Sequence, residues 1–486
     1  MTTRLLNKYT LPGLSTGHPG KRPTNPDRVH LIGIGGAGMS GIAQVLLSRN
    51  HPITGSDIQP NAATERLAAQ GATIHIGHHA DNLGEVEVVV VSSAIADDNP
   101  EVLAAKTRNI PVLLRAQMLG ELMHDSFGIT IAGSHGKTTA SALASTLLID
   151  AGLAPTYVLG GSLNATGYNA QLGDTPDYLV AEADESDGSF VQLSPALAVI
   201  TSLDPDHMDT YGGEIAHLRT AFLQFLHKLP DDGLAHLCLD HPAVRDLIPD
   251  IQRKVVGYGF ADDATVRAFD YRQQDHISQF QVATPDHPPF SIQIPLPGQH
   301  NVQNALAAIS IGLQLQIDIA VMQASLRGFQ GVGRRFNTRQ CTLPQGEITW
   351  IDDYAHHPAE LAATLEAIRD GWLERRLIVA YQPHRYTRTR DMFNELVTLL
   401  ASIPHLVLCD IYAAGETLIA GASGADLCAA VTAASQGTAP TYVAQITDLP
   451  HTLRNLIQPD DIVLTAGAGD IGQVARTLLL NPASTG

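Results

Sequence analysis

The segment from Ile131 to Thr139 constrains the fold of this chain more than any other. The apolar run Gly128-Ile129-Thr130-Ile131-Ala132 predicts a buried strand, which turns through Gly133-Ser134-His135-Gly136 into Lys137-Thr138-Thr139 and an Ala/Leu-rich helix over residues 140–150. This order of strand, glycine loop and helix is typical of a phosphate-binding loop. In such a loop, backbone N–H groups and the helix N-terminus face the anion, a lysine adds a mobile positive charge, and a hydroxyl can bind magnesium.

The spacing of the two glycines in this loop is unusual. Gly133 precedes Gly136 by three residues, whereas the common pattern separates them by five and would place the first glycine where Ile131 stands. A helix that simply starts after a glycine-rich turn is therefore an alternative interpretation. The loop favours an enzyme that uses ATP, and it leaves open what that enzyme does with the phosphate.

The length and charge of the chain restrict its class. At 486 residues it is too long for one core, and domains of about 150 residues imply about three of them. The 30 basic and 49 acidic residues give a formal net charge of −19, which disfavours nucleic acid and anionic membranes as partners, since both attract lysine and arginine. No apolar run reaches the roughly 18 residues that a membrane-spanning helix needs.

The N-terminal segment and the cysteines predict a cytoplasmic protein. Residues 1–27 mix Pro, Gly, Thr and Lys without the apolar core of a secretion signal, so we expect a flexible lead-in. Cys238, Cys341, Cys409 and Cys428 lie far apart, without the paired spacing of a zinc or redox site. We expect them to be buried packing residues in a reducing cytosol.

Before the phosphate loop, the chain alternates strands and helices. A strand over 29–34 runs into the glycine string 35–41 and a helix over 42–49, and a second strand ends at Ser56-Asp57. Further strands are expected at 72–75 and 86–92, so this block predicts a parallel sheet. The glycine string followed by Asp57 is typical of dinucleotide binding. Alone, it leaves three interpretations open: NAD, another nucleotide pyrophosphate, or tight packing without a ligand.

Polar side chains follow two strands that we expect after the phosphate loop. The strand 178–181 ends at Glu182, where a magnesium-binding carboxylate is expected beside a nucleotide, with Thr138 as the hydroxyl ligand. A solvated acidic loop is the alternative. The strand 196–201 leads to His207, which stands among several aspartates and could bind a second metal or a phosphate oxygen, or belong to a helix cap.

The rest of the chain contains an irregular block and then a third α/β block. Short apolar runs over 253–297 predict antiparallel strands, and the segment 298–304 opens a helix. From about residue 331, strands are expected at 349–351, 377–381, 406–409 and 462–465, interleaved with helices. In the first block, the neighbouring His75, His78 and His79 lack the spacing of a metal site, and we interpret them as surface residues.

Two strand ends in the third block carry further polar groups. One strand ends in Asp352-Asp353-Tyr354-Ala355-His356-His357-Pro358, and another ends in a run that contains Arg385, Arg388 and Arg390. Arg385 and Arg388 are three residues apart, so on a helix they would share one face and could hold a carboxylate with their planar guanidinium groups. Ordinary surface charge is the alternative, although basic residues are scarce in this acidic chain.

These pieces, in this order, closely resemble the Mur ligase family of bacterial cell-wall synthesis. The resemblance runs from about Val29 to about Ala475, and the shortened phosphate loop is usual in that family. Ser134 stands where threonine is common and Ala355 where glycine is common, and neither change removes a functional group. The most specific segments are Gly33-Ile34-Gly35-Gly36-Ala37-Gly38-Met39, Ala132-Gly133-Ser134-His135-Gly136-Lys137-Thr138-Thr139, Glu182-Ala183-Asp184-Glu185-Ser186-Asp187, Asp206-His207-Met208-Asp209, Asp352-Asp353-Tyr354-Ala355-His356-His357-Pro358 and Gln382-Pro383-His384-Arg385-Tyr386-Thr387-Arg388-Thr389.

The resemblance implies an α/β fold of three domains after the lead-in 1–27. A Rossmann-like domain over 28–126 would bind the UDP part of a sugar nucleotide. A central domain over 127–331, similar to a P-loop ATPase, would bind ATP and contain a parallel sheet plus a small antiparallel sheet. A Rossmann-like C-terminal domain over 332–486 would bind an amino acid and close over the site.

The resemblance also assigns roles to residues of the first two domains. Gly33, Gly35, Gly36 and Gly38 would cradle the pyrophosphate, and Ser56 and Asp57 would lie beside the uridine. ATP would bind through Gly133, Gly136, Lys137, Thr138 and Thr139, with Asn301 and Asn304 near the adenine end. Magnesium would be held by Thr138, Glu182 and His207.

In the third domain, Asp353 would lie near the nucleotide, and Arg335 would reach a phosphate or the hinge. The incoming amino acid would be held by Tyr354, His356, Arg385 and Arg388. The catalytic residues that the resemblance implies are Lys137, Glu182, His207, Arg335 and Asp353.

The implied activity is an ATP-dependent ligation in peptidoglycan precursor synthesis, which serves cell shape and division. L-alanine would be joined to the lactyl carboxylate of UDP-N-acetylmuramate through an acyl phosphate. The reaction would consume ATP, require Mg²⁺, and release ADP and phosphate. We expect a cytoplasmic monomer or homodimer without nucleic-acid or membrane partners. The alternatives are the related ligase that attaches a recycled tripeptide to the same sugar nucleotide, an NAD-dependent dehydrogenase, and a non-catalytic nucleotide sensor.

Overall fold

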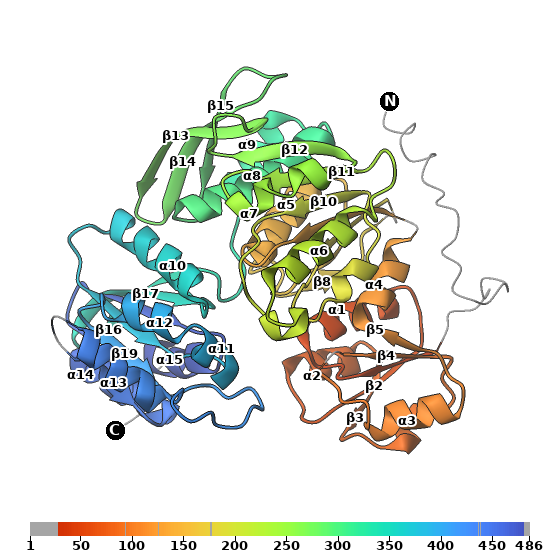
Figure 1. Cartoon of the computed structure of the whole chain (residues 1–486), viewed down its shortest axis with the longest axis horizontal. Coiled ribbons are helices and arrows are strands. Elements are labelled where there is room, and N and C mark those ends of the chain that lie inside the picture. The colour runs from red at the N-terminus through yellow and green to blue at the C-terminus, as the bar shows by residue number, and fades with distance from the viewer. Residues whose placement is uncertain are drawn as a thin grey trace. The chain divides into compact units, whose positions relative to one another are not determined.

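The computed structural model describes residues 28–92, 94–124, 126–174, 177–435, 437 and 439–480. The lead-in predicted for residues 1–27 lies outside the described residues. The chain divides into two compact units (Figure 1). The first unit contains the residues up to Phe269 together with Gln281–Ile292 and Gln303–Phe329, and the second contains Asp270–Phe280, Gln293–Val302 and the residues from Gln330 onward.

The first unit begins with a five-stranded parallel sheet of order β3-β2-β1-β4-β5. The strand order reverses beside β1, and the glycine string leaves β1 at its carboxyl end, where ligands bind in open sheets of this kind. Its strands are β1 (Val29–Ile32), β2 (Ile53–Asp57), β3 (Thr73–Ile76), β4 (Val88–Val91) and β5 (Val112–Leu114). Its helices are α1 (Ala37–Ser48), α2 (Ala62–Ala69), α3 (Pro100–Thr107) and α4 (Arg115–Met123).

A ten-stranded sheet follows, of order β15-β14-β13-β12-β11-β10-β6-β9-β7-β8. The phosphate loop leaves β6 (Phe127–Ala132), which pairs in parallel with β9 (Tyr178–Glu182) and β10 (Leu197–Ile200). The carboxyl ends of these three strands therefore meet at one edge of the sheet. The other strands are β7 (Thr156–Val158), β8 (Ala170–Gln171), β11 (Leu234–Cys238), β12 (Lys254–Gly259), β13 (Val266–Gln274), β14 (Ile277–Ala283) and β15 (Phe290–Ile294).

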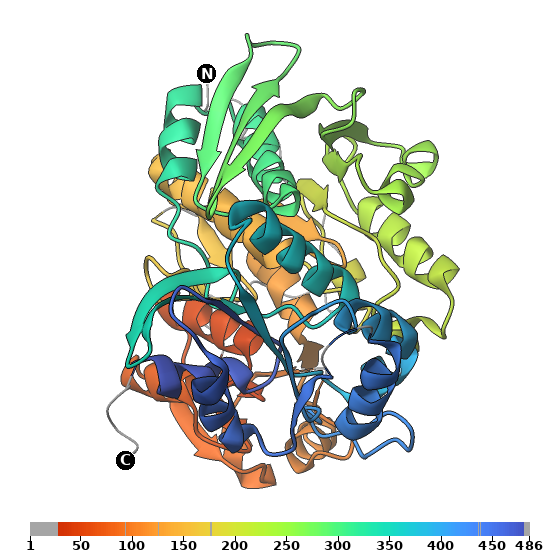
Figure 2. The ribbon, with the colours of Figure 1, turned by 90° about the vertical axis from the view of Figure 1, so that its left-hand side faces the viewer.

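The antiparallel strands predicted over 253–297 differ from the prediction in one respect. β12 pairs in parallel with β11 and with the start of β13, so the large sheet continues through this region rather than stopping before a separate small one. β13 and β14 follow each other directly as a long hairpin (Figure 2). Short apolar runs separated by turns predict strands well, but the pairing direction depends on how the chain connects them.

Five helices belong to the described part of the chain that forms the large sheet. They are α5 (Lys137–Asp150), α6 (Ile215–Leu226), α7 (Pro242–Arg245), α8 (Gln299–Gln314) and α9 (Ile319–Arg327). Both α1 and α5 start earlier than their apolar residues suggest, immediately after Gly36 and Gly136. As a result Lys137 and Thr138 belong to the first helical turn of α5 rather than to the loop before it.

One apolar core joins the five-stranded sheet to the ten-stranded sheet. A Cβ atom added to Gly41 of α1 would lie 3.1 Å from the side chain of Ala170 and 3.2 Å from that of Val158, so α1 packs closely on β7 and β8. The side-chain amide of Asn169 donates to the carbonyl of Ala37, at 2.7 Å. The two predicted N-terminal domains are therefore a single packed unit.

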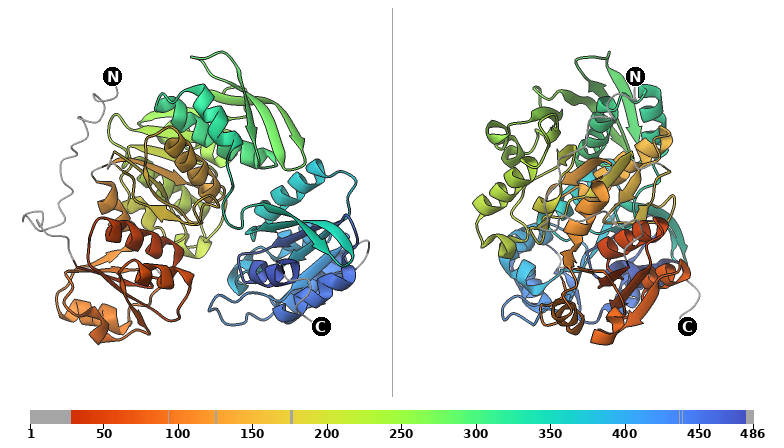
Figure 3. Two further views of the ribbon diagram at one scale, coloured as in Figure 1. Left: turned by 180° about the vertical axis from the view of Figure 1, so that it is seen from behind. Right: turned by 90° about the vertical axis from the view of Figure 1, so that its right-hand side faces the viewer.

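The second unit contains a six-stranded sheet of order β16-β17-β21-β18-β19-β20, with helices on both faces (Figures 1 and 3). β16 is antiparallel to β17, and the other neighbours are parallel. The strands are β16 (Asn337–Leu343), β17 (Gly346–Asp353), β18 (Leu377–Tyr381), β19 (Leu406–Cys409), β20 (Thr441–Val443) and β21 (Ile462–Ala466). The helices are α10 (Pro358–Gly371), α11 (Tyr386–Asp391), α12 (Phe393–Leu400), α13 (Gly424–Ala434), α14 (Leu449–Leu456) and α15 (Ile471–Leu480).

The four cysteines are not paired with one another. Cys238, Cys341 and Cys409 are buried as predicted, and Cys428 is half-buried. Burial raises the pKa of the Cys238 and Cys409 thiols to about 12, so both stay protonated at neutral pH.

Candidate active site

The loop between β6 and α5 requires glycine at two positions. Gly133 has φ of +137° and Gly136 has φ of +81°, a region that other residues rarely adopt. A Cβ atom on Gly133 would lie 2.1 Å from the Thr201 hydroxyl oxygen, and one on Gly136 would lie 2.4 Å from Oδ1 of Asn304. The glycines predicted from the sequence are thus needed both for backbone conformation and for space.

The loop is held against the end of β10. The Ser134 hydroxyl donates to the carbonyl of Asp204 at 3.0 Å and accepts from the Asp204 N–H at 2.8 Å. The N–H of His135 donates to the hydroxyl of Ser202, at 2.8 Å. These bonds fix the backbone so that its remaining donors are positioned before a ligand arrives, which is how a phosphate loop works.

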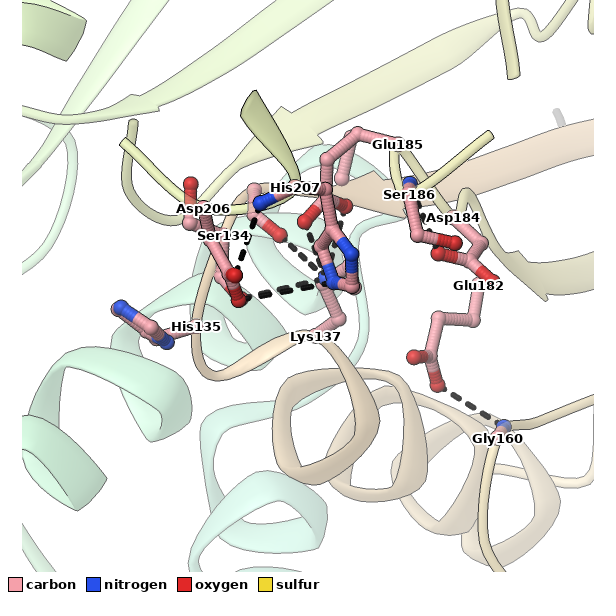
Figure 4. A network of polar contacts seen from close by, with 12 residues as sticks. Ser134, His135, Lys137, Gly160, Glu182, Asp184, Glu185, Ser186, Asp206 and His207 are labelled. Atoms are coloured by element: carbon pink, nitrogen blue, oxygen red, sulfur yellow. Dashed lines mark hydrogen bonds and ion pairs between the residues drawn. The ribbon is translucent and has the colours of Figure 1, made fainter. Parts of the chain in front are cut away.

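Lys137 is folded back onto this loop (Figure 4). Its Nζ donates to the carbonyls of Gly133, at 2.6 Å, and Ser134, at 3.3 Å. It also lies 2.9 Å and 2.7 Å from the two carboxylate oxygens of Glu185. Burial opposes the charge of this ammonium, but Glu185, Asp184 and Glu182 outweigh it and raise the pKa of Lys137.

The carboxylates beside Lys137 have different environments. Burial is the main cause that raises the pKa of Glu185 to about 7, although Lys137 acts in the opposite direction. Burial also opposes the charge of Asp184, but Arg115 and Lys137 lower its pKa. Asp184 and Glu185 were not among the predicted site residues, because only the tertiary structure shows which carboxylate of an acidic run faces the lysine.

The predicted metal ligands Thr138 and Glu182 are in contact. The Thr138 hydroxyl donates to the Glu182 carboxylate at 2.9 and 3.1 Å. The N–H of Gly160 donates to the same carboxylate at 2.9 Å (Figure 4). A hydroxyl in the first turn of α5 and a carboxylate at the end of β9 fit magnesium, which takes oxygen ligands and keeps several waters. Among the described residues, no group of three or more His, Cys, Asp and Glu side chains is arranged to hold a metal without such waters.

His207 lies on the loop after β10, where it starts a short 3-10 helix with φ of +53°. Its Nε2 lies 3.5 Å from the Asp206 carboxylate, and its N–H donates to the same side chain at 2.8 Å. His207 is therefore paired with Asp206. Figure 4 shows both residues together with Lys137 and Glu182.

Asn301 and Asn304 both lie on α8, one turn apart, and both are buried. Asn304 faces Gly136 of the loop, because a Cβ atom at that glycine would collide with the Asn304 side-chain oxygen. Asn301 donates to the carbonyl of Pro297 at 2.7 Å, before the helix begins. Thr139, the last residue of the predicted loop motif, is buried in the first turn of α5.

The glycine turn after β1 is closed by the predicted aspartate. The Asp57 carboxylate accepts from the N–H of Gly35 at 2.8 Å, and Asn61 donates to the Gly35 carbonyl at 3.3 Å. Gly33 has φ of +79°, and Gly36 caps α1 without any side-chain hydrogen bond. The turn therefore leaves the N-terminal N–H groups of α1 without a side-chain partner.

Ser56 and one of the three neighbouring histidines belong to a buried network. The Ser56 hydroxyl is fully buried, donates to Glu101 at 2.5 Å and lies 3.0 Å from Nδ1 of His78. His78 is also 3.3 Å from the Glu101 carboxylate, and His30 is 3.6 Å from it. The interpretation of His78 as a surface residue is therefore wrong, because Glu101, distant in the sequence, folds against it.

In the second unit, the end of β17 combines acidic, aromatic and basic groups. Asp353 accepts from the N–H of Ala355 at 2.9 Å and from the Thr364 hydroxyl at 3.2 Å. Burial is the main cause that raises the pKa of Asp353 to about 6, with the Arg335 charge acting against it. Arg335 lies over the ring of Tyr354, 5.0 Å from its centroid.

Two of the predicted amino-acid ligands, Tyr354 and His356, lie in a chain of ring contacts in the second unit. The rings of Tyr354 and His356 are 5.4 Å apart, those of His356 and His384 are 5.9 Å apart, and His384 stacks on Tyr412 at 5.5 Å. Arg388 lies 3.3 Å from Nδ1 of His384. His384 and Tyr412 were not among the predicted site residues; His384 could have been found from its place in the motif, but Tyr412 follows a different strand.

Arg385 is not on the helix that carries Arg388. Helix α11 starts at Tyr386, and Arg385 precedes it with φ of +69°, so the prediction that the two arginines share one helical face is wrong. The N–H of Arg385 donates to the carbonyl of Tyr412 at 2.9 Å. Glu416 accepts from the N–H and the hydroxyl of Thr387, at 3.0 and 2.7 Å, and so fixes the first turn of α11.

Three family models match this chain in succession. They describe the Mur ligase family, catalytic domain, over residues 28–127, the Mur ligase middle domain over 131–312, and the Mur ligase, glutamate ligase domain, over 334–469. A UDP-N-acetylmuramate--L-alanine ligase from Cupriavidus metallidurans is 49% identical over 458 residues, which are 93% of this chain and 97% of that protein. The chain belongs to the Mur ligase family.

Solved structures agree with the Mur ligase fold. UDP-N-acetylmuramate-alanine ligase MurC from Thermotoga maritima is 26% identical, with a TM-score of 0.79 over 94% of this chain and 99% of its own. A murein peptide ligase from Psychrobacter arcticus is 22% identical, with a TM-score of 0.69 over 95% of this chain and 99% of its own, and shows the fold alone. The predicted family, the three-domain α/β fold class and the ATP-dependent ligase class of this Mur ligase are confirmed.

No helix in the described part of this Mur ligase is both long enough and apolar enough to cross a membrane.

Proposed function

We propose that this Mur ligase joins L-alanine to the lactyl carboxylate of UDP-N-acetylmuramate and converts ATP to ADP and phosphate. The observation that carries the proposal is the 49% identity, over 93% of the chain, to the C. metallidurans ligase of that name. The 26% identity to the T. maritima ligase, with a TM-score of 0.79, supports the same substrates.

We assign Lys137 to the terminal phosphate of ATP. An ammonium has three N–H donors, and Nζ already has Gly133, Ser134 and Glu185 within hydrogen-bond distance. A phosphate oxygen must therefore replace at least one of these partners when the nucleotide binds. The N–H groups of the glycine loop would bind the other phosphates, with Asn301 and Asn304 toward the base.

We assign Thr138 and Glu182 to a magnesium ion, with His207 as a further ligand. A bound ion would neutralise charge on the phosphate oxygens, as it does in other phosphoryl-transfer enzymes. The contact between the Thr138 hydroxyl and the Glu182 carboxylate, 2.9 Å at its shortest, supports the pairing of these two side chains.

The chemistry follows from the poor reactivity of a carboxylate toward an amine. The lactyl carboxylate attacks the terminal phosphorus of ATP, ADP leaves, and the product is an acyl phosphate. The alanine nitrogen then attacks the acyl carbon, a tetrahedral intermediate forms, and phosphate leaves with the amide bond made. The role of Lys137 is to stabilise the charge that develops on the transferred phosphoryl group.

We assign the amino-acid site to the second unit. Arg385 and Arg388 would hold the alanine carboxylate, because planar guanidinium groups match planar carboxylates. Tyr354 and His356 would line the same site, and the ring contacts that join them to His384 support this grouping. Arg335 and Asp353 complete the set of catalytic candidates, and the raised pKa of Asp353 supports a functional role for that carboxyl.

The deciding experiment is phosphate release from ATP in the presence of UDP-N-acetylmuramate and one amino acid or peptide at a time. We expect L-alanine to support release, and glycine and serine to be slow, since one methyl group contributes roughly 1–3 kcal/mol of discrimination. Release with the recycled tripeptide but not with alanine would assign the chain to the related ligase.

Two further assignments rest on this function. The boundaries 28–126, 127–331 and 332–486 are proposed for the three domains, and the family matches over 28–127, 131–312 and 334–469 support them. A cytoplasmic location is proposed because ATP and the nucleotide-linked precursor are cytoplasmic substrates.

A further inference from the structure

The side chain of Arg115 lies across the glycine turn that follows β1. A Cβ atom on Gly38 would be 2.6 Å from Nη1 of Arg115 and 3.0 Å from its Cδ. Gly38 belongs to the first turn of α1, and Arg115 is the first residue of α4, directly after β5. The absence of a side chain at Gly38 therefore makes room for an arginine that is distant in the sequence.

The guanidinium of Arg115 is largely buried but only partly engaged. Its Nη2 donates to Oδ2 of Asp184 at 3.1 Å, and the side chain is 20% exposed. Within the described chain, Nε and Nη1 have no hydrogen-bond partner, although an arginine has five N–H donors. Nη1, one of the two nitrogens without a partner, is the Arg115 atom nearest to Gly38.

The turn beneath this guanidinium favours an anion. Gly36 caps α1 without a side chain, and the first turn of this 12-residue helix contains no acidic residue. The nearby Asp57 carboxylate is occupied by the N–H of Gly35 at 2.8 Å. The partial positive charge of the α1 N-terminus and the full charge of Arg115 thus face the same place.

Asp184 holds Arg115 from the other side. This carboxylate follows β9, two residues after Glu182, and also accepts from the N–H of Ser186 at 3.1 Å. Because the five-stranded and ten-stranded sheets share one core in the first unit, the contact between Arg115 and Asp184 is part of a packed interface. The arginine is therefore held over the turn before any ligand binds.

We propose that Arg115 is a binding residue for the diphosphate of the sugar nucleotide, which it contacts over Gly38 with the N–H donors that Asp184 leaves unused. The inference deepens the proposed function and rests on it. A diphosphate is the ligand chemistry that matches a guanidinium beside a helix N-terminus, because it offers negative charge and several acceptor oxygens, two of which a guanidinium can bind at once. Uridine lacks that charge, and its affinity should not depend on Arg115.

The test compares UDP with uridine as probes, using calorimetry on the full chain. We expect Arg115→Ala to weaken UDP binding by about tenfold to a hundredfold, the scale for losing one charge-assisted hydrogen-bonding partner. Uridine affinity should change by less than about twofold. Lys106→Ala, which removes an exposed positive charge from α3 of the same sheet layer, serves as the control and should leave both affinities unchanged.

A second variant protects the test against loss of folding. Arg115→Gln removes the charge but keeps a polar, unbranched side chain, and it should lose UDP affinity in the same way. If both variants bind UDP as the unmodified protein does, or lose UDP and uridine affinity alike, the inference is overturned. If the unmodified protein itself fails to bind UDP, the proposed function is overturned first, so the two failures are distinguishable.

Discussion

At the scale of single residues, the charge around Lys137 is the central feature of the candidate site. Three acids, Glu182, Asp184 and Glu185, raise the pKa of this lysine, so it stays charged although it is buried. Glu185 has a pKa raised to about 7 and is the neighbour that an incoming phosphate would displace most directly. A permanent positive charge is what a phosphoryl-transfer site needs at this position.

Removing this charge should stop the reaction. We expect Lys137→Ala to lower turnover by at least about a hundredfold, the scale for losing one preorganised partner of the developing charge. Phosphate release with all three substrates measures the effect, and Lys228→Ala, an exposed lysine far along the chain, is the control. Near-normal turnover in the Lys137 variant would remove this residue from the mechanism.

Glu101 gives a second residue-scale prediction, on stability. Burial opposes the charge of this carboxylate, but the nearby His30 and the hydrogen bonds from Ser56 and Asn82 outweigh it and lower its pKa from the ordinary 4.5 to about 2. Because the folded pKa lies below the unfolded one, the ionised group stabilises the fold above pH 4.5, and this stabilisation is lost as the pH falls toward 2.

We therefore expect Glu101→Gln to lower the free energy of unfolding at pH 7 by about 2–3 kcal/mol and to flatten its decline in acid. Urea unfolding between pH 7 and the acid limit measures both quantities. Glu121→Gln, an exposed glutamate on α4, should leave the decline unchanged. An unaltered acid slope in the Glu101 variant would contradict the assignment.

At the scale of elements, the conformation of the phosphate loop depends on Gly133. Gly133 and Gly152 both have positive φ, at +137° and +73°, but only Gly133 is crowded: a Cβ atom there would also lie 2.8 Å from the backbone nitrogen of Ser202. No atom lies within 4 Å of a Cβ atom at Gly152. Substitutions at these two glycines therefore distinguish the loss of stability caused by the backbone conformation from the loss caused by the steric collision.

We expect Gly152→Ala to cost roughly 1–2 kcal/mol, the penalty of a left-handed conformation for a residue with a side chain. Gly133→Ala should cost more and also abolish ATP binding, since the loop must move away from β10 to accept the methyl group. Urea unfolding and nucleotide calorimetry measure the two effects. Equal stability losses in the two variants would show that the loop can relax.

Helix α11 allows a similar test in the second unit. Arg385→Ala should raise the alanine concentration needed for half-maximal rate and leave the ATP requirement unchanged, because this arginine is assigned to the amino-acid carboxylate. Arg390 lies on α11 itself, 2.7 Å from the Asp391 carboxylate, and Arg390→Ala is the matched control. An effect confined to the ATP requirement would place Arg385 in a different role.

At the scale of the whole molecule, the two compact units should unfold separately. Both tryptophans, Trp350 and Trp372, are buried in the second unit, whereas the phosphate loop belongs to the first. Multidomain proteins often unfold in more than one step, and a ligand stabilises the part that binds it.

Magnesium and ATP should therefore shift the unfolding seen by far-ultraviolet circular dichroism more than the unfolding seen by tryptophan fluorescence. At a hundred times the dissociation constant, the stabilisation of the first unit should be about 2.7 kcal/mol. Denaturant titrations with both signals provide the measurement. Identical shifts in the two signals would show that the units unfold as one.

The sequence by itself determined the family of this protein and the order of strands and helices around the phosphate loop. Local patterns sufficed there, because a buried strand, a glycine turn and an amphipathic or apolar helix each have a short-range signature. The pairing of Thr138 with Glu182 was also predictable, since neighbouring parallel strands end at the same edge of a sheet.

Only the tertiary structure decided which distant side chains meet. Three pairs of neighbours at the site are separated by tens of residues in the chain: Lys137 and Glu185, Ser56 and Glu101, and Gly38 and Arg115. The conformation of Arg385 ahead of α11 was likewise set by its bond to Tyr412. Sequence spacing predicts contacts within one element, but contacts between elements depend on packing, and packing places the groups that tune charge at the site.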